Sequence, residues 1–530
     1  MCGGGLWAPA AAYAMGDETM EEVKLLCVFR MRYIDFRLAE MEALARTATG
    51  LETLPPDHAD QDPSTSPPPT GGRECFRWEY PRGGRGAMDG PFWYLIAPSR
   101  PAAEALARIV EERGVLAKVL VELWSEGDSF EDLLASLGGA NAGRVEEQKK
   151  RLPCFQTKDS TFKFVCDGFG RKIGLNEQLE RIGAVATLLG YKGKVRLKCP
   201  DYHFYIGHAT SDYEINVPEM RNTWYFGQLL ARTSTYYERY RLSDRAYLGP
   251  TSMDHEMAAV MANMGQVSRN SLVFDPYVGT GSILVACSHL GAMTFGGDID
   301  VKVILWGKDS ASGGGKKVNL WSNFDSYGLR RPLGILRCDA HALPFRNETE
   351  EVFDAVVCDP PYGIRAGGRK SGGKKAGMKE VPKDLKDSHI PSTGTYTMSE
   401  CLVDLLDLSA KLLKQGGRLV YFFPSSNGIV LKEYLPGHPC LRVDHCSEQE
   451  LTKLWGRKLV TMVKCKAWDE EEARVHKAKM LAMGSDLLKF DRLQDIVFDI
   501  VDNGGSDQDR AALRESKDNM TRRNYKGKKV

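Results

Sequence analysis

The tetrapeptide Asp359-Pro360-Pro361-Tyr362 follows directly on the apolar run 353–358. An apolar, β-branched run that stops at two prolines is typical of a buried parallel strand, because proline cannot donate to the ladder. Ligands of open α/β sheets bind at the carboxyl edge of such strands. The stretch therefore predicts a site that offers the carboxylate of Asp359, the carbonyl of Pro360 and the flat ring of Tyr362.

These groups suit a planar exocyclic amine on a nucleobase. The carboxylate and the carbonyl can accept hydrogen bonds from the amine, and the ring can stack on the base. The four residues resemble the D-P-P-Y motif of amino-methyltransferases, which methylate base nitrogens with S-adenosylmethionine. The resemblance implies that Asp359, Pro360, Pro361 and Tyr362 are catalytic. A plain strand-to-loop stop is the alternative interpretation.

A glycine-rich turn follows an earlier strand-like run. Asp275-Pro276 ends that run, and Gly279-Thr280-Gly281 leads into a helical segment. Glycines allow close approach of the backbone, and a helix N-terminus offers free N–H donors. Leu284 stands where a dinucleotide fingerprint needs its third glycine, which favours S-adenosylmethionine over a nicotinamide cofactor. We expect the helix N-terminus to bind the carboxylate of this cofactor and Asp275 to bind its ammonium group.

Two further acidic tips complete the expected cofactor site. Asp298-Ile299-Asp300 ends the second strand-like run, at the distance from the glycine turn where an acid commonly holds the ribose hydroxyls. We expect Asp298 in this role with Asp300 as the alternative, and Ile299 to pack on the adenine. A third run delivers Asp339 and Ala340, and Asp339 can accept the adenine amino group.

The pattern between residues 272 and 466 is that of an α/β domain. Strand-like runs alternate with helical segments, and a helical pattern over 255–264 precedes the first run. About seven strands result, which is typical of a doubly wound sheet of Rossmann-like methyltransferases. We expect the last strand to run in the reverse direction.

Basic residues alternate in the segment 191–206, after a helical pattern over 175–189. Period two places four of them on one face of a predicted strand: Lys192, Lys194, Arg196 and Lys198. One-sided positive charge suits phosphate contacts, although a solvated strand face would show the same pattern. The sequence from Leu197 to Asp201 resembles the last strands of a THUMP domain, which is an RNA-binding module.

Composition divides the chain further. Residues 52–90 are rich in proline, glycine, aspartate and serine, which favours a disordered insertion. The expected parts are a disordered N-terminus (1–21), a ferredoxin-like α+β domain (22–145) with the insertion 52–90, a THUMP-like domain (146–215), a linker (216–250), a methyltransferase domain (251–468) and a charged C-terminal extension (469–530). The Gly- and Lys-rich segment 367–386 fits a phosphate clamp as well as a solvated loop.

Net charge is only +1 over 530 residues, so the whole chain is no polycation and any basic surface is local. No run reaches the roughly 18 apolar residues of a membrane span, and the N-terminus lacks the pattern of a secretory signal. The thirteen cysteines form no C-x-x-C pair, so we predict no metal site. Buried thiols favour the cell interior, and we expect a cytoplasmic protein.

The order of these motifs resembles the catalytic subunit of the eukaryotic tRNA guanosine N2-methyltransferase that acts at position ten. The sequence stretches that resemble the family include Thr251-Ser252-Met253-Asp254 and Asp359–Arg365, and the resemblance covers about residues 22 to 466. It implies tRNA as substrate, methylation of the guanine exocyclic amine, a small zinc-binding activator subunit as partner, and Arg365 as a further RNA contact.

Three alternatives stay open. The nearest is another base amino-methyltransferase, acting on a different tRNA guanosine, on ribosomal RNA or on adenine in DNA. A non-catalytic RNA-binding scaffold with the same fold is a second class. A nicotinamide oxidoreductase is the third, and Leu284 disfavours it.

Overall fold

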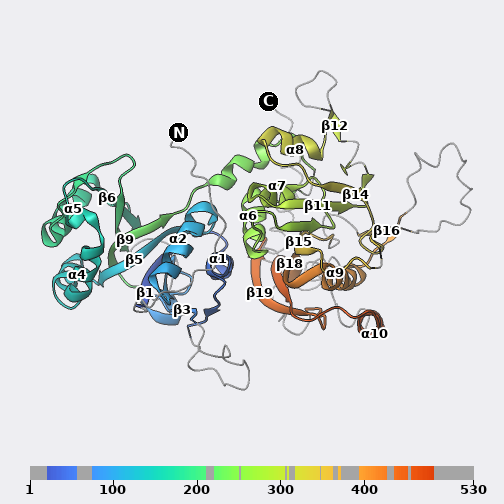
Figure 1. The fold of residues 1–530 in the computed structure, drawn as a ribbon, viewed down its shortest axis with the longest axis horizontal. Coiled ribbons are helices and arrows are strands. Elements are labelled where there is room, and N and C mark those ends of the chain that lie inside the picture. Colours follow the sequence, from blue (N-terminus) through green and yellow to red (C-terminus); the bar gives the residue numbers. More distant parts are fainter. Residues whose placement is uncertain are drawn as a thin grey trace, which may run out of the picture. The chain divides into compact units, whose positions relative to one another are not determined.

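The computed structural model describes residues 21–56, 74–210, 220–249, 252–301, 303–304, 307–309, 317–346, 348–361, 368–371, 393–426, 435–451 and 455–482. The chain forms two compact units (Figure 1). The first comprises residues 1–28, 48–108 and 119–231, and the second comprises residues 29–47, 109–118 and 232–530. No helix in the described ranges is long and apolar enough to cross a membrane.

A nine-stranded mixed sheet organises the first unit. Its strand order is β2 (Thr53–Leu54), β3 (Phe76–Glu79), β4 (Phe92–Ala97), β1 (Val23–Phe29), β5 (Ala117–Gly127), β9 (Thr223–Arg232), β8 (Tyr202–Ala209), β6 (Thr161–Phe169) and β7 (Lys194–Val195). Helices α2 (Arg100–Arg113), α3 (Phe130–Gly138), α4 (Ala142–Arg151) and α5 (Leu175–Leu189) accompany it. Aromatic side chains dominate the core, where Trp124 meets Phe204 and Phe226 edge-on.

This continuous sheet corrects two expectations about the domains. Strands from the predicted ferredoxin-like part (22–145) and the predicted THUMP-like part (146–215) hydrogen-bond into one sheet. The predicted linker (216–250) is wrong as a plain connector, because it contributes β9 between β5 and β8. The segment is rich in arginine and tyrosine, but most residues of β9 are buried.

The predicted disordered insertion is wrong for its two ends. Residues 52–56 and 74–90 are described and contribute β2, β3 and a 3-10 turn at Gly84–Ala87. Trp78 on β3 is fully buried and packs edge-on against Trp93 at 5.8 Å between ring centroids. Two buried aromatic residues on β3 supply the apolar surface that the average composition concealed. The middle of the insertion and residues 1–20 lie outside the described ranges.

The second unit contains the predicted seven-stranded sheet. Its strand order is β14 (Gly334–Arg337), β11 (Met293–Asp298), β10 (Leu272–Asp275), β15 (Phe353–Cys358), β18 (Leu413–Ser426), β20 (Trp455–Lys464) and β19 (Leu441–Glu450). The first five strands pair in parallel, whereas β20 runs antiparallel to both of its neighbours. The doubly wound α/β fold with a reversed last strand is therefore confirmed.

Helices cover both faces of this sheet. The side chains of Ala355 and Val357 share a core with α6 (His255–Met264) and α7 (Ser282–His289), and those of Val356 and Cys358 share another with α9 (Met398–Leu412). This alternation is the period of a strand buried on both faces. Helix α8 (Leu320–Tyr327) packs on α7, and two short ribbons, β12–β13 (Lys308–Asp309, Lys317–Val318) and β16–β17 (Arg369–Ser371, Thr393–Thr395), extend from the unit.

A buried polar cluster joins distant segments of the second unit. Helix α1 (Arg37–Thr49) contributes Glu40, whose carboxylate accepts the amide N–H groups of Val115 and Leu116. The side-chain amide of Asn263 on α6 donates to Glu40 over 2.7 Å and accepts from Arg113 over 2.8 Å. Satisfied polar groups of this kind fix the register between the segments that carry them.

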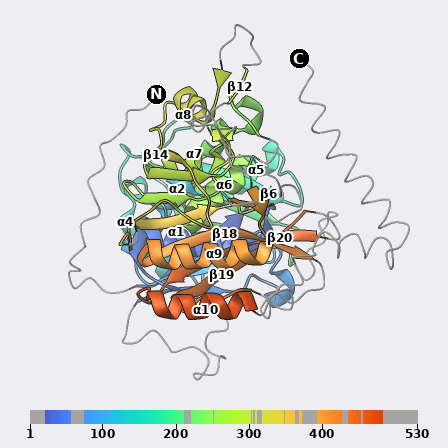
Figure 2. The same ribbon diagram turned by 90° about the vertical axis from the view of Figure 1, so that its right-hand side faces the viewer.

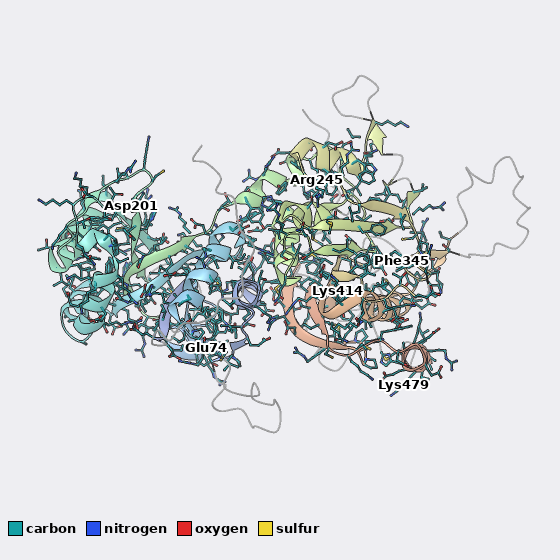
Figure 3. All side chains as sticks on the ribbon, viewed as in Figure 1. Glu74, Asp201, Arg245, Phe345, Lys414 and Lys479 are labelled. Atoms are coloured by element: carbon teal, nitrogen blue, oxygen red, sulfur yellow. The ribbon has the colours of Figure 1, made fainter. Side chains whose placement is uncertain are left out.

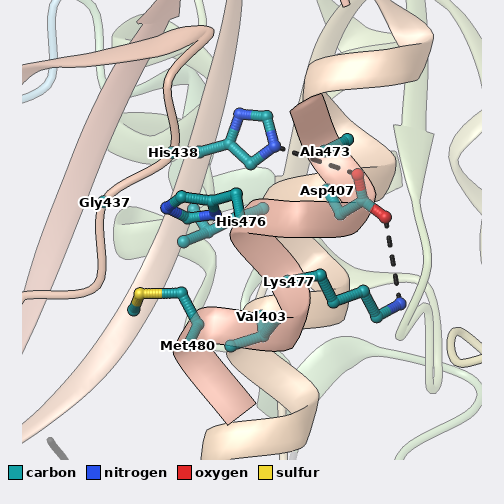
Figure 4. A pocket seen from close by; sticks show the side chains of 9 residues that line it. Val403, Asp407, Gly437, His438, Ala473, His476, Lys477 and Met480 are labelled. Carbon is teal, nitrogen blue, oxygen red and sulfur yellow. Dashed lines mark ion pairs between the residues drawn. The ribbon is translucent and has the colours of Figure 1, made fainter. Parts of the chain in front are cut away.

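The predicted charged extension (469–530) begins as an ordered helix. Helix α10 (Glu470–Ala482) packs beside α9, as Figure 2 shows. A small pocket between them brings His438, His476 and Lys477 around Asp407 (Figure 4). The ammonium group of Lys477 also lies 2.6 Å from the carboxylate of Asp404. These contacts explain the order of α10, and we assign no chemistry to this pocket.

Candidate active site

The glycine turn and the D-P-P-Y stretch emerge at the same edge of the sheet. Strands β10 and β15 are adjacent and parallel, with Val273 opposite Ala355 and Phe274 opposite Val356. This register brings Asp275 and Asp359 to neighbouring strand tips. The predicted convergence of these two strand tips at one edge of the sheet is confirmed. Tyr362 and Arg365 lie outside the described residues, so their predicted roles stay predictions.

The turn after β10 has the backbone that its glycines permit. Gly279 has a φ of 50° and Gly281 a φ of 82°, both in the left-handed region that disfavours a side chain. A Cβ at Gly279 would approach no described atom closer than Tyr277 O at 3.9 Å, so the turn leaves room above it for a ligand. Helix α7 starts directly after Gly281, and its N-terminus can bind a carboxylate.

The electrostatics of this edge favour a cation. Asp275 is buried, and its Oδ1 accepts the amide N–H of Tyr277 over 2.9 Å. Burial raises the pKa of Asp275 well above its usual range, and the charges of Asp298 and Asp359 add to the rise. Carboxylates that raise one another's pKa gain from a positive ligand. The ammonium and sulfonium groups of S-adenosylmethionine match this requirement, so the residues present fit that cofactor.

Asp298 organises the tip of β11. Its Oδ2 accepts the amide N–H of Gly279 over 2.9 Å, and its Oδ1 accepts that of Asp300 over 2.8 Å. Desolvation raises the pKa of Asp298 despite these two hydrogen bonds. Asp300 is exposed at the same tip, and Ile299 lies between the two acids. Both predicted ribose acceptors therefore lie beside the glycine turn.

The predicted adenine acceptor, Asp339, lies after β14, and its neighbour Ala340 is buried with it. The carboxylate of Asp339 accepts the amide N–H of His341 over 2.9 Å and that of Ser371, in the short strand β16, over 2.6 Å. An adenine amino group would share these oxygens with the two backbone donors. Ser371, in the Gly- and Lys-rich segment, thus contacts the predicted adenine acceptor. Most of that segment lies outside the described residues.

The structure adds residues around the turn that sequence reasoning missed. The hydroxyl groups of Ser252 and Thr280 lie 2.8 Å apart, and Asn323 on α8 donates to the carbonyl of Thr280 over 3.1 Å. Arg245, labelled in Figure 3, is buried and donates to the hydroxyl of Ser282, the first residue of α7. The quoted motif 251–254 was a signal for Ser252. Arg245 lay within the predicted linker and carried no such signal.

Arg457 on β20 is a further residue that the sequence did not single out. Its Nη1 lies 3.5 Å from Oδ2 of Asp359, and its guanidinium lies over the ring of Phe422. No local sequence motif marks Arg457. The pairing of β18 with β20 brings it to this edge, and that pairing cannot be read from the neighbouring residues.

The predicted basic strand face in the first unit is wrong. Only Lys194–Val195 forms a strand, and the following residues bend away, with Cys199 at a φ of 46°. Asp201, labelled in Figure 3, holds the bend by accepting the amide N–H of Thr161 over 2.7 Å. Val195 and Leu197 are 66% and 77% exposed instead of facing a core. The four basic side chains are all exposed: Lys192, Lys194, Arg196 and Lys198.

A cavity of about 180 Å³ lies in the second unit between the segment 340–349 and α9. Its lining includes Lys411 and Leu412 at the C-terminal end of α9. The next residue, Leu413, pairs with Phe353 at the start of β15. The cavity therefore extends from Ala340, beside the predicted adenine acceptor, toward the amino edge of the sheet.

Comparisons with known proteins identify the family of the chain. Residues 88–235 match the Tmrp11 THUMP N-terminal domain, and residues 243–376 match the RMKL-like methyltransferase domain family UPF0020. The human tRNA (guanine(10)-N(2))-methyltransferase TRMT11 is 36% identical over 401 residues, which cover 73% of this chain and 82% of that protein. The TRMT11 protein of Dictyostelium discoideum is 33% identical over 489 residues, covering 88% and 86%.

Among solved structures, TrmN from Thermus thermophilus aligns with 18% identity and a TM-score of 0.34, covering 84% of this chain and 100% of that one. The fold assignment rests on the strand order above and not on this alignment. Sequence identity over most of both chains decides the family. The chain belongs to the TRMT11 family of S-adenosylmethionine-dependent tRNA (guanine(10)-N(2))-methyltransferases.

Proposed function

We propose that this chain transfers a methyl group from S-adenosylmethionine to the exocyclic N2 of the guanosine at position ten of tRNA. The observation that carries the proposal is the parallel pairing of β10 with β15, which places the glycine turn and Asp359 at one edge. Family membership supplies the substrate. It also disfavours the alternatives of a nicotinamide oxidoreductase and a DNA methyltransferase.

The proposed chemistry is a problem of orientation. The lone pair of the guanine exocyclic amine is delocalised into the ring, so the amine is a poor nucleophile. Asp359 and the carbonyl of Pro360 accept its two N–H groups and direct the lone pair toward the cofactor side of the cleft. Pro361 fixes the backbone, and Tyr362 stacks on the flipped base. Oriented acceptors and near-attack positioning supply several kcal/mol in such reactions.

The proposed cofactor site is built around the glycine turn. S-adenosylmethionine supplies the methyl group when it is bound. Asp275 binds its ammonium group, and the turn Gly279-Thr280-Gly281, entered through Pro276, presents the N-terminus of α7 to its carboxylate. Asp298 binds the ribose, with Asp300 as the alternative. Around the base, Ile299 packs on the adenine, Asp339 accepts the adenine amino group, and Ala340 lies next to Asp339 in the cofactor site.

The test compares Asp359→Ala with Asp354→Ala in the full chain, using a labelled methyl donor and total tRNA. Asp354 is a matched control because it lies on the same strand and pairs with Lys414 at 2.7 Å, away from the carboxyl edge. Asp359→Ala should abolish transfer while cofactor binding persists, and Asp354→Ala should retain most of its turnover. Near-normal turnover in Asp359→Ala would refute the catalytic assignment.

Nucleoside analysis of the labelled RNA identifies the product. N2-methylguanosine at position ten is expected. Label at another tRNA guanosine or in ribosomal RNA would redirect the proposal to that substrate. Cofactor binding without transfer to any RNA would instead favour a scaffold that has kept the fold.

We also propose a small zinc-binding activator subunit as partner, as the resemblance to the family implies, and a cytoplasmic location. All twelve cysteines in the described ranges are free thiols, which suits a reducing compartment. Co-expression with the activator should yield a complex with higher activity than the chain alone. A fluorescent fusion should show the location directly.

A further inference from the structure

Arg457 reaches the acceptor side of the site from a strand two places away from β15 in the sheet. Its Nη1 lies 3.5 Å from Oδ2 of Asp359, and the two side chains are only 11% and 22% exposed. An ion pair shielded to this degree has a stronger interaction than one at the surface. The contact joins a residue without a predicted role to the proposed acceptor of the amine.

The guanidinium of Arg457 is held on several sides. Its Nε donates to Oε1 of Gln449 over 2.8 Å, and its Nη2 lies 3.6 Å from the sulfur of Met253. The ring of Phe422 lies 3.8 Å from Cζ, measured to the ring centroid, which is the geometry of a cation–π contact. These partners come from separate segments, so the sheet fixes both the position and the plane of the cation.

We propose that Arg457 is a positioning residue that holds the carboxylate of Asp359 in the orientation in which it accepts the exocyclic amine. The proposal rests on the role proposed for Asp359. A fixed cation at one carboxylate oxygen limits the rotation of the group. Limited rotation matters for rate, because displacement of a reacting group by about 1 Å can lower turnover a hundredfold.

The same contacts connect Asp359 to the glycine turn. Met253 is buried beside Arg457, and the preceding residue, Ser252, shares a hydrogen bond with Thr280. The chain from Thr280 through Ser252 and Met253 to Arg457 therefore ends at Asp359. Displacement of Arg457 should disturb the alignment of the two halves and not the affinity of either.

Arginine and lysine are not equivalent at this position. The planar guanidinium stacks on Phe422 while it donates to Gln449 and faces Asp359, and a lysine ammonium cannot do all three. Arg457→Lys should therefore keep the charge and the fold but recover only part of the turnover. A purely electrostatic role would be rescued almost fully.

The experiment measures kcat for methyl transfer, the KM for tRNA and the Kd for S-adenosylmethionine in the full chain co-expressed with its activator. Arg457→Ala should lower kcat about ten- to a hundredfold and leave KM and Kd nearly unchanged. In an Asp359→Asn background, Arg457→Ala should add little further loss. Arg418→Ala is the matched control, because Arg418 is a buried arginine paired with Asp444 at 2.8 Å. Its effect should be on thermal stability and independent of Asp359.

The outcomes separate this proposal from the function on which it rests. A raised KM with unchanged kcat would make Arg457 an RNA contact and overturn the positioning role. Losses that add fully to those of Asp359→Asn would overturn it as well. Should Arg457→Ala fail to fold, a folded Arg457→Lys with full kcat would do the same. Near-normal turnover in Asp359→Asn alone would instead refute the role proposed for Asp359, and no transfer to tRNA by the wild-type chain with its activator would refute the proposed function.

Discussion

The amide N–H of Gly279 donates to Oδ2 of Asp298 over 2.9 Å, and this hydrogen bond joins the tips of β10 and β11. The second oxygen of the same carboxylate accepts the amide N–H of Asp300. One side chain thus holds both the glycine turn and the acidic tip in place. This relationship makes Asp298 a test point for the donor half of the site.

Asp298→Ala should weaken the binding of S-adenosylmethionine more than Asp300→Ala does. The change removes a ribose acceptor and two backbone contacts of the turn, and hydrogen bonds to a charged group contribute about 1.5–3 kcal/mol each. A rise in Kd of at least about tenfold should follow. Isothermal titration calorimetry measures both variants. The reverse ranking would assign the ribose to Asp300.

The affinity for S-adenosylmethionine should rise with pH. Burial and the neighbouring acids raise the pKa of Asp275 in the folded chain, so the carboxylate ionises only at a pH above the usual value of about 3.9. A cationic ligand binds the ionised form, and binding should strengthen as the pH rises through the raised pKa. Kd measured at several pH values below about 7.7, where the ligand amine stays charged, checks this. In Asp275→Asn the dependence should be shallower, and an unchanged slope would contradict the assignment.

The raised pKa of Asp275 has a second consequence for stability without ligand. Its folded form holds the proton more tightly than its unfolded form, so this group stabilises the fold at low pH. That contribution should be lost as the pH rises above the unfolded value of about 3.9. Denaturant unfolding of the wild-type chain and of Asp275→Asn over this pH range should therefore diverge, and the variant should be the more stable of the two at neutral pH.

The exposed basic segment of the first unit should bind RNA without supporting the fold. Replacing four residues by alanine should lower tRNA affinity: Lys192, Lys194, Arg196 and Lys198. The slope of the logarithm of the binding constant against the logarithm of the salt concentration should fall in magnitude by roughly 0.7–0.9 for each phosphate that the chain no longer neutralises. The melting temperature should not change, because all four side chains are exposed. Lys149 and Lys150 serve as the control pair, since Glu146 and Glu147 already compensate their charges at 2.6 Å. An unchanged salt slope would remove the segment from the RNA surface.

Asp444 should support the second unit at neutral pH. Burial raises its pKa, but the positive groups of Arg418, His445 and Arg46 outweigh burial and hold the pKa well below its usual range. A lowered pKa stabilises the fold above the unfolded value of about 3.9, and this contribution is lost as the pH falls below that value. Asp444→Asn should cost about 3–5 kcal/mol at neutral pH, since it leaves buried cations unpaired.

Denaturant unfolding at neutral and acidic pH checks that expectation. The difference between wild type and Asp444→Asn should shrink as the pH falls. Asp325→Asn is the control, because Asp325 forms a comparable pair with Arg331 at 2.5 Å on the exposed surface of α8. It should change stability little. Equal losses in the two variants would contradict the special role of Asp444.

Local signals in the sequence predicted elements of both units. The helices over 175–189 and 255–264 occur at the predicted bounds, and β15 ends directly before Asp359. The spacing of apolar residues and the positions of glycine and proline determine secondary structure locally, so they predict helices and strands without knowledge of the fold. For the same reason the donor turn and its acids were found by position along the chain.

The sequence by itself determined which strand tips carry the glycines, the acids and the two prolines. Only the tertiary structure decided which remote segments meet there. Arg457 contacts Asp359, and β9 enters the sheet between β5 and β8, through pairing of strands that are far apart along the chain. The basic residues after Tyr191 form no strand face, because most of that segment has no partner strand in the described sheet. Long-range pairing depends on the whole folded chain, and no local period encodes it.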